Sequence, residues 1–186
     1  MRLTNSCLVV LTALACPGVI DAARLTVERG SNLQSVIDYA ANGDTILLAA
    51  KTFEARPTQF TDPLCGNCLD PVTAVPATRG FVVKGKSLII VGRDRSASKL
   101  ITNAGYGVYF EDSPNSRLMN LTITGGKRDP DGNATDAGIV VRRSRVYVEN
   151  VDIRDNDHRL DSVVVGVGGI FGREGAEIFM TGCTLI

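Results

Sequence analysis

The spacing of glycines constrains the fold of this chain more than any other feature of its sequence. Gly80, Gly107, Gly138 and Gly169 each precede a short hydrophobic segment, and they are 27, 31 and 31 residues apart. When the segments are aligned on these glycines, apolar residues coincide in three columns. The columns contain Ile90, Leu118, Val148 and Met180; Leu121, Val151 and Cys183; and Ile123, Ile153 and Leu185. A self-similar period of roughly 20 to 50 residues is typical of repeat architectures. We therefore expect each repeat to contribute one residue of similar character to each column.

Two repeat architectures fit this period. The segment VENVDIRDN matches the pattern of leucine-rich repeats, in which a helix or helical turn usually follows the strand. The segments GIVVRRSRVYVEN and GIFGREGAEIFM instead alternate with period two and are rich in β-branched side chains, which indicates strands. The sequence therefore predicts an all-β fold, a parallel β-helix in which each repeat contributes two or three short strands.

Small or amide residues mark a second position in the repeats. Gly92, Asn120, Asn150 and Gly182 follow the glycine column by twelve or thirteen residues. Asparagine and glycine tolerate left-handed backbone angles, and amides stacked about 4.8 Å apart can hydrogen-bond to one another. We therefore expect corners of the repeats at these positions, and not catalytic residues.

The segment SNLQSVIDYAANG, residues 31–43, is predicted to form a short amphipathic helix. Ser31 is the expected N-cap, and Asn42 with Gly43 ends the helix. The expected apolar face contains Leu33, Val36, Ile37 and Ala40. A helix at this place would cover the first repeat, whose strand edges and apolar interior would otherwise be open.

The opening SNLQSVIDYAANGDTILLAAKTF resembles that of secreted parallel β-helix proteins of the pectin-lyase-like superfamily. The resemblance is specific at Gly43, Asp44, Thr45 and Ile46, which match the turn from the capping helix into the first repeat. It implies an all-β, right-handed parallel β-helix with an N-terminal capping α-helix, which covers residues 23–186 as one domain.

The same resemblance implies a function in polysaccharide chemistry. Many members of the superfamily are lyases, hydrolases, esterases or epimerases that act on acidic sugars, whereas others are adhesins, so the fold alone does not choose between them. This chain departs from the common opening at Lys51, and it lacks the Asp-His and Arg-x-Pro-x-x-Arg signatures of pectate lyases. No catalytic residue is therefore transferred. We expect a protein that binds or modifies an acidic polysaccharide, the alternative being a non-catalytic adhesion or structural module.

Residues 1–22 are predicted to be an export signal. Arg2 supplies the positive start, and residues 7–15 form an apolar run too short to cross a membrane. Alternatively, ALAC, which ends at Cys16, resembles a lipoprotein cleavage box. The protein is therefore expected to be secreted or held at the cell surface.

No later segment has the roughly 18 apolar residues of a transmembrane helix. The 20 basic and 20 acidic residues cancel, which argues against a nucleic-acid partner.

Three cysteines remain after removal of the export signal. Export favours disulfides, so Cys65 and Cys68, in the loop segment TDPLCGNCLDP, are predicted to pair. Half of a zinc site and a redox pair remain alternatives for this motif. Cys183 falls in an inward-facing column and is expected to be buried.

The segment NVDIRDNDHR, residues 150–159, concentrates charged side chains around the only histidine of the chain. In a lyase or epimerase, an arginine or histidine would accept the proton and aspartates would bind Ca²⁺ beside the sugar carboxylate. The alternative is a solvated turn whose charges pair with one another. The expected proton acceptors are Arg154, His158 and Arg159, and the expected calcium ligands are Asp152, Asp155 and Asp157.

Two further polar groups are candidates for binding. The segment KRDPDGNATDAG would either supply oxygen ligands to calcium or form an insertion between repeats. Its ligands would be Asp129, Asp131, Asn133 and Asp136. Arg142, Arg143 and Arg145 would hold sugar carboxylates by bidentate hydrogen bonds if they flank an outward groove. Otherwise these arginines form the usual polar exterior of a β-helix.

The carboxyl-terminal segment MTGCTLI stops inside one of the aligned columns, without a turn or a covering helix. Repeat proteins generally need a capped end to stay soluble. We therefore expect either further repeats after Ile186 or a partner chain at this end of the stack.

Overall fold

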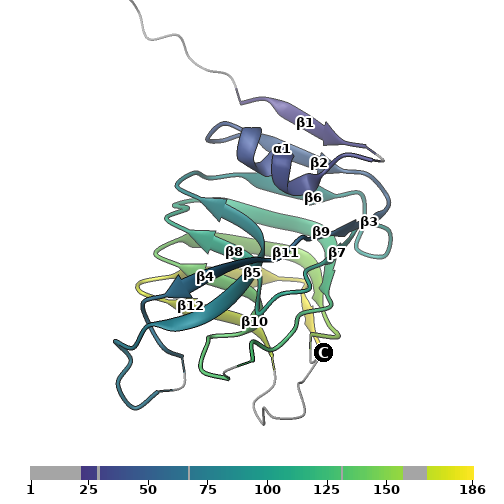
Figure 1. Ribbon diagram of the computed structural model, residues 1–186. Coiled ribbons are helices and arrows are strands. Elements are labelled where there is room, and N and C mark those ends of the chain that lie inside the picture. Colours follow the sequence, from purple (N-terminus) through teal and green to yellow (C-terminus); the bar gives the residue numbers. More distant parts are fainter. Residues whose placement is uncertain (1–21, 29, 67, 131, 157–166) are drawn as a thin grey trace, which may run out of the picture.

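The fold consists of two sheets of mainly parallel strands and one short helix, which confirms the all-β prediction (Figure 1). The predicted export signal, apart from its last residue, lies outside the described residues, as do Asp131, Asp157, His158 and Arg159. The computed structural model describes residues 22–28, 30–66, 68–130, 132–156 and 167–186.

The larger sheet has nine strands, all of them paired in parallel. They are β1 (Arg24–Val27), β2 (Thr45–Leu48), β3 (Thr52–Glu54), β6 (Ile89–Gly92), β7 (Lys99–Ile101), β9 (Ser116–Thr124), β11 (Arg145–Ile153), β13 (Glu177–Thr181) and β14 (Thr184–Leu185). The main path runs β1-β2-β6-β9-β11-β13, while β14 pairs with β11, and β7 pairs with both β3 and β9.

The smaller sheet has five strands in the order β12-β10-β8-β5-β4. They are β4 (Thr58–Asp62), β5 (Val75–Lys84), β8 (Tyr106–Glu111), β10 (Ala137–Arg142) and β12 (Gly168–Arg173). The pairs among β5, β8, β10 and β12 are parallel, whereas β4 is antiparallel to β5. The strand β4 therefore belongs to a segment that interrupts the repeats.

The strand registers confirm the aligned columns. Leu118 pairs with Ile90 and with Val148, and Val148 pairs with Met180. The registers of the smaller sheet bring the four glycines of the first column side by side. A Cβ atom on Gly80 would lie 2.6 Å from the carbonyl oxygen of Gly107. Neighbouring backbone leaves no room for a side chain at Gly80 and Gly107, and the side chains of Ile153 and Leu185 come closest at Gly138 and Gly169.

The predicted corners are confirmed at three of the four positions. Asn120, Asn150 and Gly182 have φ angles of 55°, 53° and 64°, in the left-handed region. Nδ2 of Asn150 donates a hydrogen bond to Oδ1 of Asn120 at 2.8 Å, as expected for stacked amides. Gly92 is not among the left-handed residues. It is glycine because a Cβ atom there would collide with the backbone of Asn120.

The main hydrophobic core lies between the two sheets, and the helix α1 (Leu33–Tyr39) covers its amino-terminal end (Figure 1). Leu33 and Ile37 are buried in this core. The predicted N-cap was wrong by one residue, because Oδ1 of Asn32 accepts the hydrogen bond from the amide of Ser35 at 3.1 Å. The helix thus caps the first strands as the amphipathic pattern indicated.

The opposite end of the core is more open. Met180 and Leu185 occupy inward-facing columns, yet 37% and 49% of their surfaces are exposed. Cys183 is only partly buried, although it packs against the core as predicted. Within the described part of the chain, β12, β13 and β14 each have a paired strand on one side only.

A second, smaller hydrophobic cluster lies on the outer face of the five-stranded sheet. Residues 55–66 and 68–75, which include β4, fold over this face, and the predicted disulfide between Cys65 and Cys68 is confirmed within them. Residues 127–130 and 132–136, here called the acidic segment, pack beside them. The cluster contains Cys65, Val75, Ala77, Tyr106, Tyr109, Ala134, Ala137 and Val140.

Candidate functional site

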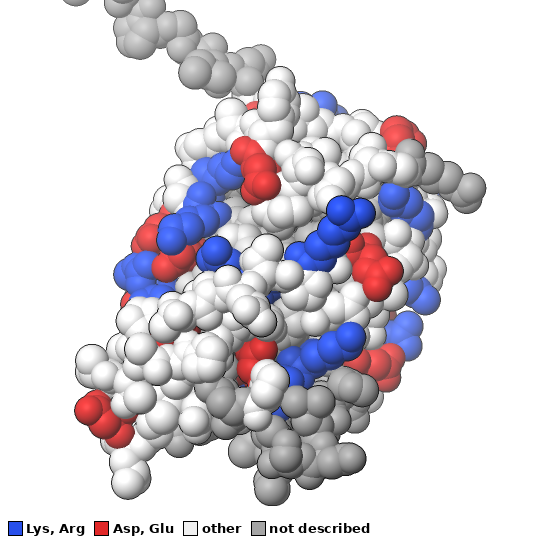
Figure 2. Space-filling model, viewed as in Figure 1, with Lys and Arg blue, Asp and Glu red and all other residues white. Residues whose placement is uncertain are grey.

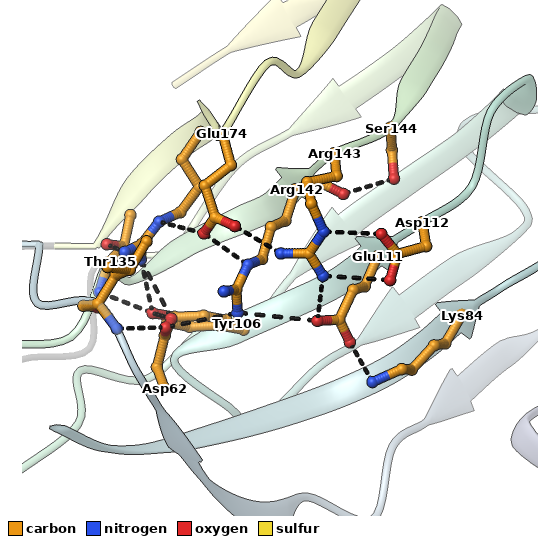
Figure 3. Close-up of polar contacts among 12 residues, drawn as sticks. Asp62, Lys84, Tyr106, Glu111, Asp112, Thr135, Arg142, Arg143, Ser144 and Glu174 are labelled. Atoms are coloured by element: carbon orange, nitrogen blue, oxygen red, sulfur yellow. Dashed lines mark hydrogen bonds and ion pairs between the residues drawn. The ribbon is translucent and has the colours of Figure 1, made fainter. Parts of the chain in front are cut away.

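A column of charged residues crosses the outer face of the five-stranded sheet (Figure 3). It contains Lys84, Glu111, Arg142 and Arg173, one from each parallel strand. Nζ of Lys84 lies 2.6 Å from Oε2 of Glu111, and Nη1 of Arg142 lies 3.7 Å from Oε1 of the same carboxylate. Burial alone would raise the pKa of Glu111, but hydrogen bonds from Lys84 and Arg143 hold it below its usual value.

Asp62, at the end of β4, supplies the central carboxylate of this network and is completely buried. Nη1 of Arg173 lies 3.1 Å from Oδ2 of Asp62, and Nη1 of Arg142 lies 3.6 Å from Oδ1. The hydroxyl of Tyr106 donates to Oδ2 of Asp62 at 2.6 Å, and burial together with this bond raises the pKa of Tyr106. The covering strand β4 is therefore fixed to the sheet by charge-assisted hydrogen bonds.

The three arginines that were predicted to hold sugar carboxylates are all paired with carboxylates of this chain. Nε of Arg142 lies 2.5 Å from Glu174, and the side chain of Arg142 is only 9% exposed. Arg143 contacts Asp112 at 2.7 Å, and its hydrogen bond lowers the pKa of that carboxyl. Arg145 contacts Glu177 at 2.8 and 3.0 Å. A sugar carboxylate would have to displace these partners.

The network as a whole is charge-balanced. Its four cationic residues face four anionic ones, so its formal charge is zero. Basic and acidic side chains are likewise interleaved over the face shown in Figure 2. The cationic residues are Lys84, Arg142, Arg143 and Arg173, and the anionic ones are Asp62, Glu111, Asp112 and Glu174. Such an arrangement holds the covering strand β4 in place. Because its charges cancel, it exerts little net electrostatic attraction on a polyanion.

The charged segment that follows Asn150 is described only in part. Asp152 is held by Nη1 of Arg95 at 3.2 Å, and Arg154 lies 3.5 Å from Asp155. Thr122, which pairs in register with Asp152, is buried, and its hydroxyl donates to the carbonyl of Arg95 at 2.6 Å. Among the described residues, no three His, Cys, Asp or Glu side chains are grouped to hold a metal ion. The assignment of proton acceptors and calcium ligands here stays a prediction.

Two carboxyl groups of the acidic segment come into direct contact. The amide and hydroxyl of Thr78, on β5, donate to Asp129 at 2.9 and 2.7 Å. Oδ2 of Asp136 accepts from the amide of Asp129 at 2.8 Å and lies 3.0 Å from Nη1 of Arg128. Oδ2 of Asp129, which accepts from the amide of Thr78, and Oδ1 of Asp136 both lie 2.3 Å from the position that a Cβ atom on Gly105 would take. The two aspartates thus face each other on the protein side of the segment.

This contact changes the acidity of the pair. Burial, followed by the neighbouring Asp129 carboxyl, raises the pKa of Asp136 to about 7, although Arg128 opposes the shift. Oδ1 of Asp136 is buried, and no donor of the described residues reaches it. A proton on this oxygen, directed at Asp129, would give it a hydrogen-bond partner. Asp136 therefore keeps its proton up to about neutral pH.

A cavity of about 470 Å³ opens beside this pair, between β4, β5 and the acidic segment. A volume of this size suits a small ligand or one residue of a polymer. Arg79, which follows the lining residue Thr78 in β5, lies 4.9 Å over the ring of Phe60 and donates to Oγ1 of Thr58 at 3.3 Å. Among the described residues it forms no ion pair, unlike the arginines of the network. The lining includes Gln59, Phe60, Thr61, Thr78, Asp129 and Pro130.

The sequence indicated some of these residues and missed others. It singled out Asp129 and Asp136 for their spacing, but as calcium ligands, whereas their described partners are Thr78, Arg128 and each other. It gave no sign of Asp62 or Arg79, because β4 and the start of β5 lie outside the repeat pattern. The signal in the sequence for residues of this kind is a polar side chain in or beside a segment that interrupts the repeats.

Comparisons with known proteins give no identity for the chain, since no family model, no curated protein and no solved structure matches it. The described residues contain no helix that is long and apolar enough to cross a membrane. The function must therefore be argued from the geometry itself.

Proposed function

We propose that this chain is an exported right-handed parallel β-helix protein, similar to the pectin-lyase-like superfamily, that binds an acidic polysaccharide at the cavity beside Asp129. The fold proposal is supported by like residues that pair in register about one repeat apart, such as Leu118 with Val148. The glycine column and the amide contact between Asn120 and Asn150 support it as well.

The observation that carries the binding proposal is the cavity together with Arg79, which lies over the lining ring of Phe60 and forms no ion pair among the described residues. Hydroxyl and amide groups of Gln59, Thr61 and Thr78 line the cavity, together with the ring of Phe60. A sugar residue offers hydroxyl groups for the former and apolar C–H groups for the latter. Polymer-binding sites of this kind combine an apolar surface with a few polar groups that fix orientation.

The positive charge of Arg79 indicates that the sugar is an acidic one. Arg142, Arg143 and Arg145 are each engaged by carboxylates of this chain. Among the described residues, the side chain of Arg79 has only a hydroxyl and an aromatic ring as partners, so it can form a bidentate hydrogen bond with a uronate carboxylate. An oligomer of uronic acid should therefore bind more tightly than a neutral oligomer of the same linkage.

The test is calorimetric titration with a uronic acid oligomer and with its neutral counterpart. Loss of one charged hydrogen bond in Arg79→Gln should weaken binding of the acidic oligomer roughly tenfold and leave the neutral one unchanged. Arg93→Gln is the matched control, because Arg93 is exposed and also forms no ion pair among the described residues. Equal binding by the two variants would contradict the proposal.

Turnover is a separate question, which the same oligomer answers. If the protein is a lyase or epimerase, incubation with the acidic oligomer yields cleaved or epimerised product. Substitution of Arg154, His158 or Arg159 should then abolish that product while binding persists. Product formation that survives all three substitutions would remove these residues from the predicted catalytic group.

A second function, a non-catalytic adhesion or structural module, is favoured by the open end of the core. The partly exposed Met180 and Leu185 and the one-sided pairing of β12 and β13 suit a partner that adds a further strand. Such a module would bind saturably without turnover. Leu185→Ser would weaken its association, and Arg79→Gln would not.

A further inference from the structure

We propose that Asp129 and Asp136 form a proton-operated latch that holds the acidic segment against β5. The latch is closed while the two carboxyl groups share one proton, and it opens when that proton is lost. Because Asp129 and Pro130 line the cavity, opening would alter the wall of the polysaccharide site. Only this consequence for the site rests on the proposed function, since the latch itself operates without a ligand.

The first half of the latch joins the acidic segment to the five-stranded sheet. Asp129 receives both hydrogen bonds that Thr78 of β5 can donate, from its amide and from its hydroxyl. The same hydroxyl accepts a hydrogen bond from the amide of Gly105 at 2.9 Å, just before β8. Asp129 therefore attaches the segment to β5 and, through the hydroxyl of Thr78, to the residue before β8.

The second half is the contact that depends on the proton. Asp136 is only 6% exposed as a residue, and its side chain is completely buried. Its Oδ2 has the amide of Asp129 and the guanidinium of Arg128 as partners, whereas its Oδ1 faces the other carboxyl without a donor. Two ionised carboxylates in contact repel each other, so a shared proton is what makes this arrangement stable.

The positive charge of Arg128 does not replace the proton that the contact between Asp129 and Asp136 needs. It also donates to the carbonyl of Ala134 at 3.2 Å and to the carbonyl of Gly132, both in the acidic segment itself. Its charge therefore stabilises the fold of the segment as well as Oδ2 of Asp136. A single cation beside two carboxylates still leaves one negative charge uncompensated in a buried place.

The other charged and titratable groups around the segment belong to the neighbouring network. Nη1 of Arg173, from β12, donates to Oγ1 of Thr135 at 2.8 Å, and the hydroxyl of Tyr106, from β8, accepts from the amide of Thr135 at 3.1 Å. Asp62, from β4, binds both of these groups. Arginine stays charged, and the pKa of Tyr106 is raised above its usual value. From β5, the side chain that contacts the pair is the neutral Thr78, which binds Asp129.

A catalytic role for Asp136 is excluded by its burial, since a general acid must reach the reacting atom. The latch instead makes it a positioning residue. The pKa of Asp136 is about 7 in the folded chain and roughly 4 for an aspartate in the unfolded chain. Between these values the folded state binds the extra proton, so stability decreases as pH rises from about 4 to about 7. Above that range this contribution is lost.

The decisive experiment compares thermal unfolding of the wild type and of Asp136→Asn, without ligand, between pH 5 and pH 8. The Tm of the wild type should fall by about 5 °C or more over this range. In Asp136→Asn, a side-chain amide hydrogen replaces the shared proton, so this fall should largely disappear. Glu177→Gln removes an exposed carboxylate of another ion pair and should keep the wild-type pH dependence. An unchanged fall in Asp136→Asn would overturn the latch.

A second measurement keeps the proposal testable if the asparagine variant does not fold. The side-chain carboxyl carbon of Asp136 can be followed in the wild type by NMR as pH is varied. A midpoint near 7, with exchange-broadened amides in the acidic segment above it, would support the latch. A midpoint below pH 5 would overturn it. Titration with the uronic acid oligomer then separates the two proposals, because an intact latch with no binding at any pH would reject only the proposed function.

Discussion

The two faces of the five-stranded sheet are held by different kinds of contact. On the inner face, Phe81 of β5, Val108 of β8 and Ile139 of β10 pair in register and pack into the main core. On the outer face, Glu111 and Arg142 are also in register, but Asp62, the buried partner of Arg142, comes from the interrupting strand β4. The inner face is assembled by neighbouring repeats, and the outer face by segments that do not belong to them.

This difference has an energetic consequence. Apolar burial contributes about 25 cal/mol per Å² without regard to direction, so one inner residue can be exchanged for another of similar size. Buried charges are stable only with their specific partners, and loss of one partner leaves an uncompensated charge. The inner face should therefore respond to changes in volume, and the outer face to changes in charge.

Truncation of the inner face should have the largest effect. Phe110 is completely buried between the sheets, so Phe110→Ala should decrease the free energy of unfolding by about 4 kcal/mol. The measurement is urea denaturation followed by circular dichroism. Tyr39→Ala is the control, because Tyr39 is 83% exposed and its loss should cost no more than about 0.5 kcal/mol. Similar losses in the two variants would mean that the space between the sheets is not the main core.

Removal of one charge from the outer face should come next. Asp62→Asn keeps the volume but leaves Arg142 and Arg173 without their central carboxylate, so we expect a loss of about 3 kcal/mol. Asp112→Asn is the matched control, since this side chain is 47% exposed and its contact with Arg143 should contribute less than about 1 kcal/mol. If both changes cost the same, burial under β4 would not be what makes the network strong.

The inner face could be predicted from the sequence because its residues repeat. The columns through Leu118 and Val148, the glycine positions and the amide contact of Asn120 with Asn150 all follow from the period. The outer face could not be predicted in this way. Asp62 binds Arg173, which is 111 positions away, and no period relates a residue of an interrupting segment to a strand. The site at the cavity has the same origin and was missed for the same reason.

Sequence spacing also failed to identify the partners of residues that it located correctly. Arg142 was expected on the outer side of the sheet and lies there, but β4 covers it and its guanidinium binds Glu174. Asp129 and Asp136 were predicted either to bind calcium or to lie in an insertion between repeats, and in the structure they face each other. Alternation in a strand determines on which side a side chain lies. It does not determine which group arrives from elsewhere in the chain to bind it.

Substitution in the glycine column tests how closely the strands approach one another, and it should cost less free energy of unfolding than the two changes above. A Cβ atom on Gly107 would collide with the backbone of Gly138, so Gly107→Ala should cost about 2 kcal/mol by forcing the strands apart. Gly168→Ala, in the same sheet, is the control, because the nearest atom to its Cβ would lie at an ordinary 3.5 Å. Unfolding in urea measures both. Equal tolerance of alanine at the two positions would show that the strands approach less closely here.

The smallest effect is expected for an ion pair of good geometry that no segment covers. Arg145 and Glu177 form two short hydrogen bonds, yet their side chains are 47% and 50% exposed. Water and salt screen such a pair, so Arg145→Gln should cost about 0.5 kcal/mol at low salt and less at high salt, as urea unfolding at both ionic strengths would show. Asp62 has longer contacts with Arg142 but no exposure, and its substitution should cost several times more. A loss for Arg145→Gln as large as that for Asp62→Asn would mean that contact geometry, and not exclusion of water by β4, determines the strength of ion pairs in this protein.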